Sequence, residues 1–263
     1  MTGQVLCETR GAVLTLTLDN PGSRNALTLE MSAQLCAALR EAALDPAVRV
    51  VVLTGRGGAF CAGGDVKAMA AGRDAGWTAE QRASRLRDRA ESVRLLHEMG
   101  KPTVAVLAGA VAGAGLGLAL ACDFRFARSD VKLTTAFARV GLAGDFGVNW
   151  LLTRMLGIAR ARELMMFAPL LTADQAYAMG LLTRVFSAEE FEAKTEALVA
   201  ELAAGPTIAY GHIKQVTSLA SACALAPSLD AEALHQANCM VTEDHAGAAR
   251  AFAEKRPPVF NGR

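Results

Sequence analysis

The sequence lacks paired cysteines, has few aromatic residues and shows no excess of either charge. Its six cysteines form no CxxC pair and have no regular spacing. This argues against a disulfide framework and predicts a reducing compartment, the cytoplasm. The four histidines are scattered and form no HExxH or Cys/His cluster, so we expect no metal site. With 27 basic and 26 acidic residues, nothing electrostatic favours nucleic acid or an anionic membrane as the main partner.

One long stretch lacks charge altogether. The 20 residues from 103 to 122 have no acidic or basic side chain, and that length suits a membrane-spanning helix. Seven of these residues are alanine and four are glycine, however, so bulky apolar side chains are sparse. The segment PTVAVLAG is typical of a buried strand, and GAGLGLALAC of a tightly packed helix. We therefore predict a strand and a helix here, with no membrane span. The N-terminal stretch MTGQVLCETR also lacks the features of a signal peptide.

The apolar pattern along the chain predicts an α/β fold with a helical C-terminal part. Period-two alternation on both sides of Gly11 predicts a hairpin. The segment VRVVVLTG is a nearly continuous apolar run, as expected of a strand covered on both faces. Residues 28–44 are amphipathic with a helical period, and Thr28 is the candidate N-cap. From Asp145 onward helical patterns dominate. Hydrophobic residues make up 52% of the chain and aromatic residues 5%, so the core is rich in Ala, Val and Leu.

Two glycine-rich segments each follow a predicted strand. Gly113, Gly115 and Gly117 do not complete a dinucleotide fingerprint, because Leu118 follows them and no matching acidic residue lies in a βαβ unit. No GK[ST] sequence marks a phosphate-binding loop. A helix start after a strand still exposes backbone N–H groups, and two such starts facing one oxygen would form an oxyanion hole. FCAGGD and GAVAGAGLG are the candidates. Equally, their glycines could serve only close helix packing.

Several motifs in order resemble one known family. The motifs are NPGSRNAL (20–27), GGAFCAGGDVKAM (57–69), AGAVAGAGLGLALACDFRFA (108–127), LTADQAYAMGLLTRVF (171–186) and FAEKRPPVF (252–260). In these motifs and over nearly its whole length, the sequence is similar to the crotonase superfamily, also called the enoyl-CoA hydratase/isomerase family. The resemblance implies a spiral of ββα units in residues 1–200, a helical trimerisation region in residues 201–263, and trimers or dimers of trimers. It also implies a coenzyme A (CoA) thioester as substrate, with no further cofactor.

The resemblance also assigns roles to single residues. The backbone N–H groups of Gly64 and Ala114 would hold the thioester oxygen. Asp65 suits a helix cap or loop anchor better than a catalyst, and Cys61 suits a space-filler better than a nucleophile. Packing and a surface charge are alternative roles for Phe252 and Lys255. Residues expected to contact CoA or substrate are Ser23, Arg24, Ala26, Ala62, Gly63, Asp65, Val66, Phe137, Phe252 and Lys255.

This chain departs from the family's hydratases at their two catalytic glutamates. Gly117 and Phe137 stand at those positions, so general base and general acid for hydration are both missing. A glycine at 117 predicts free space there, for a bulky acyl group or as an empty pocket. One carboxylate remains, Asp145, where some isomerases of the family and a dehalogenase branch carry an aspartate. Capping the helix that starts near Phe146 is its alternative role.

A single acid/base suits isomerisation, which moves one proton between two carbons without water. The sequence therefore predicts an enoyl-CoA isomerase in which Asp145 shuttles the proton. The alternatives are a hydratase-like enzyme with an unusual base, a dehalogenase-like or thioester-hydrolase-like enzyme, and an acyl-CoA-binding protein with little catalysis.

Overall fold

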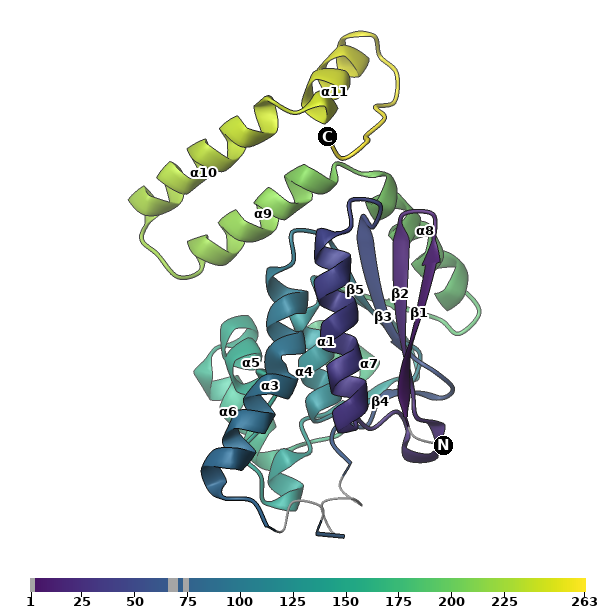
Figure 1. Cartoon of the computed structure of the whole chain (residues 1–263), viewed down its shortest axis with the longest axis vertical. Coiled ribbons are helices and arrows are strands. Elements are labelled where there is room, and N and C mark those ends of the chain that lie inside the picture. Colours follow the sequence, from purple (N-terminus) through teal and green to yellow (C-terminus); the bar gives the residue numbers. More distant parts are fainter. Residues whose placement is uncertain (1–2, 66–70, 73–75) are drawn as a thin grey trace.

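The larger sheet is built from parallel strands with one antiparallel hairpin at its edge. The structure is a computed structural model that describes residues 3–65, 71–72 and 76–263. Among these residues, the strand order is β1-β2-β3-β5-β7-β10 (Figure 1). β1 and β2 form the hairpin predicted around Gly11, and the remaining neighbours pair in parallel. The strands are β1 (Gln4–Arg10), β2 (Val13–Asp19), β3 (Val50–Gly55), β5 (Thr103–Leu107), β7 (Phe124–Arg128) and β10 (Arg184–Phe186).

A second, smaller sheet contains the strands β4, β6 and β8, which follow β3, β5 and β7 of the larger sheet along the chain. Its order is β4-β6-β8-β9 within the described residues, and β4, β6 and β8 pair in parallel. Each chain segment thus runs β3 to β4, β5 to β6 or β7 to β8 before a helix follows. This repetition confirms the predicted spiral of ββα units. The strands are β4 (Ala59–Cys61), β6 (Ala110–Ala112), β8 (Lys132–Thr134) and β9 (Leu171–Thr172).

Helices α1 (Leu29–Leu44) and α3 (Ala79–Glu98) lie side by side against the strands (Figure 1). The Thr28 hydroxyl accepts a hydrogen bond from the Met31 N–H at 3.1 Å, so the predicted N-cap of α1 is confirmed. Positions of α1 that are buried recur every three or four residues, because one face of the helix covers the core. The next helical segments are α4 (Ala114–Ala121), η2 (Phe137–Val140), α5 (Val148–Leu156), α6 (Ile158–Phe167) and α7 (Ala173–Ala178).

The uncharged run from 103 to 122 forms β5, β6 and α4. Every residue of α4 is buried, and small residues allow that close packing. The prediction of a strand followed by a packed helix is confirmed. In the part of the chain that the structure describes, no helix is both long enough and apolar enough to cross a membrane.

The last helices stand away from the sheets. Residue 200, where we expected the core to end, lies inside α8 (Phe191–Ala204), which contacts β2, β3 and β7. After it, α9 (Thr207–Ala220), α10 (Leu225–Met240) and α11 (Glu243–Ala253) extend beyond the core (Figure 1). Arg49 ties the start of this region down: its guanidinium donates to Thr207 Oγ1 and Phe260 O at 2.8 Å, and to Gly205 O.

Candidate active site

The two glycine-rich segments meet at one edge of the smaller sheet. β4 and β6 are parallel neighbours, so the chain that leaves each strand emerges at the same edge. A Cβ atom at Gly63 would lie 3.3 Å from the Ala114 nitrogen and 3.0 Å from Ala112 O. Gly63 also has a φ of 96°, which disfavours any other residue. The absence of a side chain at this position therefore lets one backbone approach the other.

Two backbone N–H groups are available at this meeting point. Ala114 is the first residue of α4, and the N–H groups of the first helical turn have no partner within the helix. Within the described residues, no backbone hydrogen bond uses the N–H of Gly64 or of Ala114. Such groups can stabilise negative charge on an oxygen that lies between them.

Close packing is also part of the role of these glycines. A Cβ atom at Gly115 would lie 2.4 Å from Cys61 O, so α4 can approach β4 only with glycine there. Cys61 is fully buried, and burial raises the pKa of its thiol to about 12. The thiol is therefore neutral at physiological pH, which agrees with a space-filling side chain.

The segment expected to contact CoA pairs directly with the first glycine-rich segment. The Leu27 N–H donates to Gly63 O at 2.8 Å, and the Ala62 N–H donates to Arg24 O at 3.0 Å. Ser23 is half-buried, Arg24 is exposed and Ala26 is buried. These residues therefore flank Ala62 and Gly63, as a common binding path requires.

Asn25 holds this segment in place, and sequence reasoning missed it. Its side chain donates to Ala59 O at 2.9 Å and to Arg56 O at 2.8 Å. It also accepts from the Asn20 N–H at 2.9 Å. Asn25 is fully buried with a φ of 58°, a conformation that asparagine tolerates better than most residues. Pro21 and Gly22, a few positions earlier in the same segment, are turn-forming residues that could have indicated it.

Asp145 lies in the turn that leads into α5. Its Oδ1 atom is buried and has no hydrogen-bond partner among the described residues. Helix α5 has Gly147 as its N-cap, without a side-chain cap, and only the backbone carbonyl of Asp145 accepts from Val148 N–H, at 3.1 Å. The Asp145 side chain thus does not serve as the helix cap. Burial raises the pKa of its carboxyl group, and the positive charge of Arg89 opposes that shift.

The space beside Gly117 is filled, so our expectation that it leaves room for substrate was wrong. A Cβ atom at Gly117 would lie 2.3 Å from Phe146 O and 2.8 Å from Phe146 Cβ. The backbone next to Asp145 therefore occupies the place where the family's hydratases carry their first glutamate. Phe137, at the second glutamate position, is buried, and its ring lies 3.8 Å from where a Cβ atom of Gly113 would be. Phe137 thus packs beside the start of α4.

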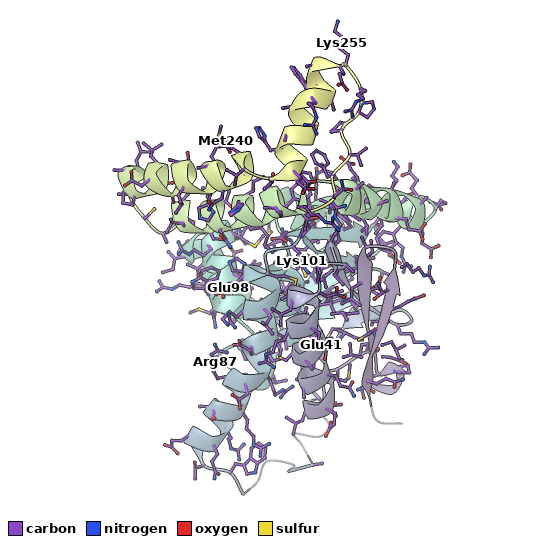
Figure 2. The ribbon with its side chains drawn as sticks, turned by 45° about the horizontal axis from the view of Figure 1, so that its top comes forward. Glu41, Arg87, Glu98, Lys101, Met240 and Lys255 are labelled. Carbon is purple, nitrogen blue, oxygen red and sulfur yellow. The ribbon has the colours of Figure 1, made fainter. Side chains whose placement is uncertain are left out.

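Four of the expected contact residues lie outside the described site or at its edge. Val66 lies outside the described residues, and Asp65 is the last residue before that gap. Phe252 is 87% exposed at the end of α11. Figure 2 shows Lys255 at the outer tip of this region, away from the sheets. Within one chain, Phe252 and Lys255 are therefore not brought to the meeting point of the two glycine-rich segments.

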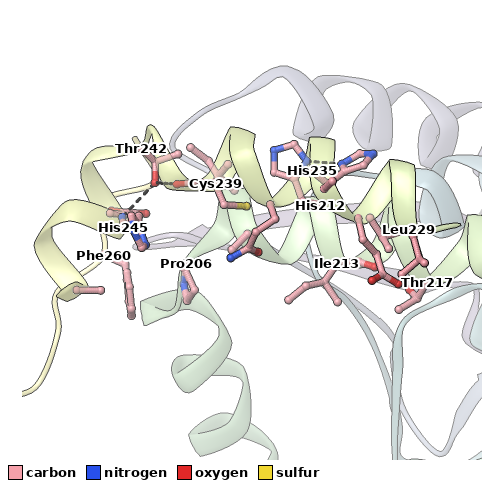
Figure 3. Close-up of a pocket in the computed structure, with 18 residues that line it drawn as sticks. Pro206, His212, Ile213, Thr217, Leu229, His235, Cys239, Thr242, His245 and Phe260 are labelled. Carbon is pink, nitrogen blue, oxygen red and sulfur yellow. Dashed lines mark hydrogen bonds between the residues drawn. The ribbon is translucent and has the colours of Figure 1, made fainter. Parts of the chain in front are cut away.

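A separate groove lies between α9, α10 and α11. It encloses about 740 Å³ and is lined mainly by apolar side chains of these helices (Figure 3). His212 and His235 face each other there, with 2.7 Å between their Nδ1 atoms. Sequence reasoning left these histidines without partners, because they lie 23 residues apart. Asp145, Gly64 and Ala114 do not line this groove.

Comparison with known proteins agrees with this geometry. Residues 8–263 match the model of the family described as enoyl-CoA hydratase/isomerase. The chain is 34% identical to 1,2-epoxyphenylacetyl-CoA isomerase of Escherichia coli K12 over 98% of each protein. It is 31% identical to trans-2-decenoyl-[acyl-carrier-protein] isomerase of Streptococcus mutans over 99% of this chain and 98% of that one.

Solved structures agree as well. A crystal structure of an enoyl-CoA hydratase from Polaromonas sp. JS666 superposes with a TM-score of 0.92 at 34% identity, covering 98% of this chain and 100% of that one. The chain belongs to the enoyl-CoA hydratase/isomerase family, whose members process acyl-CoA thioesters.

The contact between Gly117 and Phe146 gives a first prediction. We expect Gly117→Ala to lower the free energy of unfolding by about 2 kcal/mol, because the added methyl group forces the Phe146 backbone to move. Gly247→Ala is the matched control: it also lies in a helix, but its Cβ atom would meet nothing within 4 Å. That variant should gain about 0.5–1 kcal/mol from helix propensity. Urea denaturation at pH 7 measures both, and equal effects would show that position 117 has unused room.

Proposed function

We propose that this protein is an enoyl-CoA isomerase, and that the Asp145 carboxylate moves the proton. The observation that carries the proposal is the buried Oδ1 atom of Asp145, which has no hydrogen-bond partner among the described residues. Phe146 links this residue to α4 through its contact with Gly117, one helical turn from Ala114. A carboxylate without a structural partner is costly to bury, and a proton-transfer role explains why it is present.

The chemistry of the proposal is a proton transfer through an enolate. With a 3-enoyl-CoA, Asp145 takes a proton from C2, and the electron pair moves onto the thioester oxygen as the new enolate forms. The N–H groups of Gly64 and Ala114 stabilise that oxygen; in comparable sites the loss of one donor costs about 3 kcal/mol. Asp145 then returns its proton to C4, and the double bond lies between C2 and C3. No water is consumed and no cofactor is needed beyond the CoA of the substrate.

The residues at the two hydratase positions support isomerisation over hydration. Hydration needs groups that activate and hold a water molecule. Here Gly117 has no side chain and Phe137 is apolar, and the Phe146 backbone fills the space next to Gly117. Relatives of this chain include isomerases and a hydratase, so the names alone do not choose. The six free cysteines further support a reducing compartment, for which we propose the cytoplasm.

A second candidate uses the same carboxylate differently. As a nucleophile, Asp145 could attack an activated carbon of the acyl group, as in the dehalogenase branch that the sequence resembles. The buried Oδ1 atom of Asp145 suits this role also, because a desolvated carboxylate oxygen is a stronger nucleophile. The two candidates differ in their products: the isomerase returns the proton and moves the double bond, whereas the nucleophile forms an ester with Asp145 and releases a leaving group.

Exchange in deuterated water tests the proposal. We expect 3-enoyl- or dienoyl-CoA thioesters to gain deuterium at C2 or C4 while the double bond moves, as measured by NMR and mass spectrometry. Asp145→Asn should lower the rate about 10²–10⁴-fold, which is the usual contribution of a general acid/base. Asp130→Asn is the control, because Asp130 pairs with Arg128 on the surface. Full turnover in Asp145→Asn would contradict the mechanism. Binding without exchange or product would favour an acyl-CoA-binding protein.

We also propose that the chain assembles as a homotrimer, alone or as a pair of trimers. The C-terminal helices carry large apolar side chains that are exposed in the single chain, and such patches mark contact surfaces. A neighbouring subunit would cover them, and Phe252 and Lys255 could then contact the CoA of that subunit. The exposed residues are Leu225, Leu229, Leu234, Met240, Val241, Phe252 and Val259.

Light scattering tests the assembly. The wild-type protein should have three or six times the mass of one chain. Leu229→Glu should shift it toward the monomer, because the new charge would have to be buried at the contact. Glu232→Lys is a control on the same helix, with one charged side chain replaced by another. A wild-type monomer at micromolar concentration would rule out the proposed trimer.

A further inference from the structure

Arg89 contacts both the segment expected to bind CoA (residues 20–27) and the turn that carries Asp145. It lies on α3, and its guanidinium group reaches three other elements. Nη2 donates to Leu27 O at 3.2 Å, and Nε donates to Ser32 Oγ at 3.3 Å. The Cζ atom lies 5.8 Å from the ring centroid of Phe146, within the range of a cation–π contact. One side chain therefore contacts residues 20–27, α1 and the turn that carries Asp145.

Two of these contacts, with Leu27 and Phe146, lead to groups of the proposed mechanism. Leu27 is bonded through its N–H to Gly63 and forms a parallel bridge with Gly64. Leu27 thus fixes the segment that provides the first oxyanion donor. Phe146 is the residue next to Asp145 and packs against Gly117 of α4. By holding Leu27 and Phe146 together, Arg89 sets the position of the carboxylate relative to the oxyanion donors.

The charge of Arg89 matters as much as its geometry. A base must be ionised to take a proton, and burial disfavours the ionised form of Asp145. Among the described residues, Arg89 is the charged group that counters this effect at Asp145. The Arg89 charge also acts on the Cys61 thiol of β4, but burial outweighs it and raises the pKa of that thiol to about 12, so the thiol stays neutral. Arg89 therefore acts on the one ionisable group that the mechanism uses.

We propose that Arg89 is a positioning residue that orients the Asp145 turn against the oxyanion segment and places a positive charge near the Asp145 carboxylate. This inference rests on the proposed function, because it assigns Arg89 to the same reaction. In this inference Arg89 acts through Asp145 and Leu27 and does not contact the substrate. A guanidinium suits the task because its planar fork can donate in two directions while its face lies over an aromatic ring.

A direct titration of Asp145 tests the inference without relying on turnover. Protein labelled with ¹³C at the aspartate carboxyl groups is titrated by NMR, and the Asp145 signal is assigned by its absence in Asp145→Asn. We expect Arg89→Gln to raise the pKa of Asp145 by about one unit, because a nearby positive charge is lost. Arg89→Lys should restore most of the shift, since it keeps the charge. Arg94→Gln removes a charge from the same helix at a site that pairs with Glu91 and Glu98, and should change nothing.

Exchange rates measured across pH provide the functional readout. In Arg89→Gln the acid limb should move to higher pH with the pKa, so exchange falls about tenfold at pH values below both pKa values. A smaller loss of exchange rate that persists at high pH would measure how much Arg89 contributes by orienting the Asp145 turn. If Asp145 titrates alike in wild type and Arg89→Gln, while the thermal unfolding of the variant shows that it is folded, the inference is overturned. Full turnover in Asp145→Asn would instead overturn the proposed function. The NMR titration would still show whether Arg89 affects the pKa of Asp145.

Discussion

The candidate site depends on a close approach between two backbones, with no side chain between them. Parallel pairing of β4 and β6 brings the ends of both strands to one edge. There, Gly63 lies so near Ala114 that even a methyl group would come within 3.3 Å of the Ala114 nitrogen. Gly115 packs as tightly against Cys61. Because these contacts are made by backbone, the positions of the two N–H donors are set by the fold itself. The nearby side chains adjust the site and do not create it.

Asp145 and the missing hydratase glutamate belong to one structural arrangement. Phe146 has a φ of 48°, which costs a non-glycine residue about 1–3 kcal/mol. In that conformation its carbonyl fills the space beside Gly117, so a glutamate there and this turn cannot coexist without rearrangement. The same turn buries the Oδ1 atom of Asp145, which has no hydrogen-bond partner among the described residues. The fold thus bears a strained residue and an incompletely satisfied carboxylate at one place. Functional sites commonly carry such costs.

Much of the fold could be predicted from the sequence, because the spacing of apolar residues and the local composition indicate strands, helices and turns. The hairpin at Gly11, the N-cap at Thr28, and the strand and helix within 103–122 all follow local rules, and all are present. The motif order identified the family, which the comparisons confirm. Contacts between distant segments could not be predicted in this way. Gly117 looked like empty space because the Phe146 backbone arrives from 29 positions further along the chain. Arg89 is one of five arginines in α3, and its position beside Leu27 and Phe146 distinguishes it from the others.

The most direct test of the account is the stability of Asp145→Asn as a function of pH. Burial raises the folded-state pKa of Asp145, so the folded protein binds this proton more tightly than the unfolded chain does. Stability is then lost as pH rises through the interval between the two pKa values. The account predicts that Asp145→Asn is more stable than wild type in urea at pH 7, and that the difference shrinks as the pH falls through that interval. If Asp145→Asn is less stable than wild type at pH 7, the carboxylate stabilises the fold. That result would contradict the claim that Asp145 is present for proton transfer at the cost of stability.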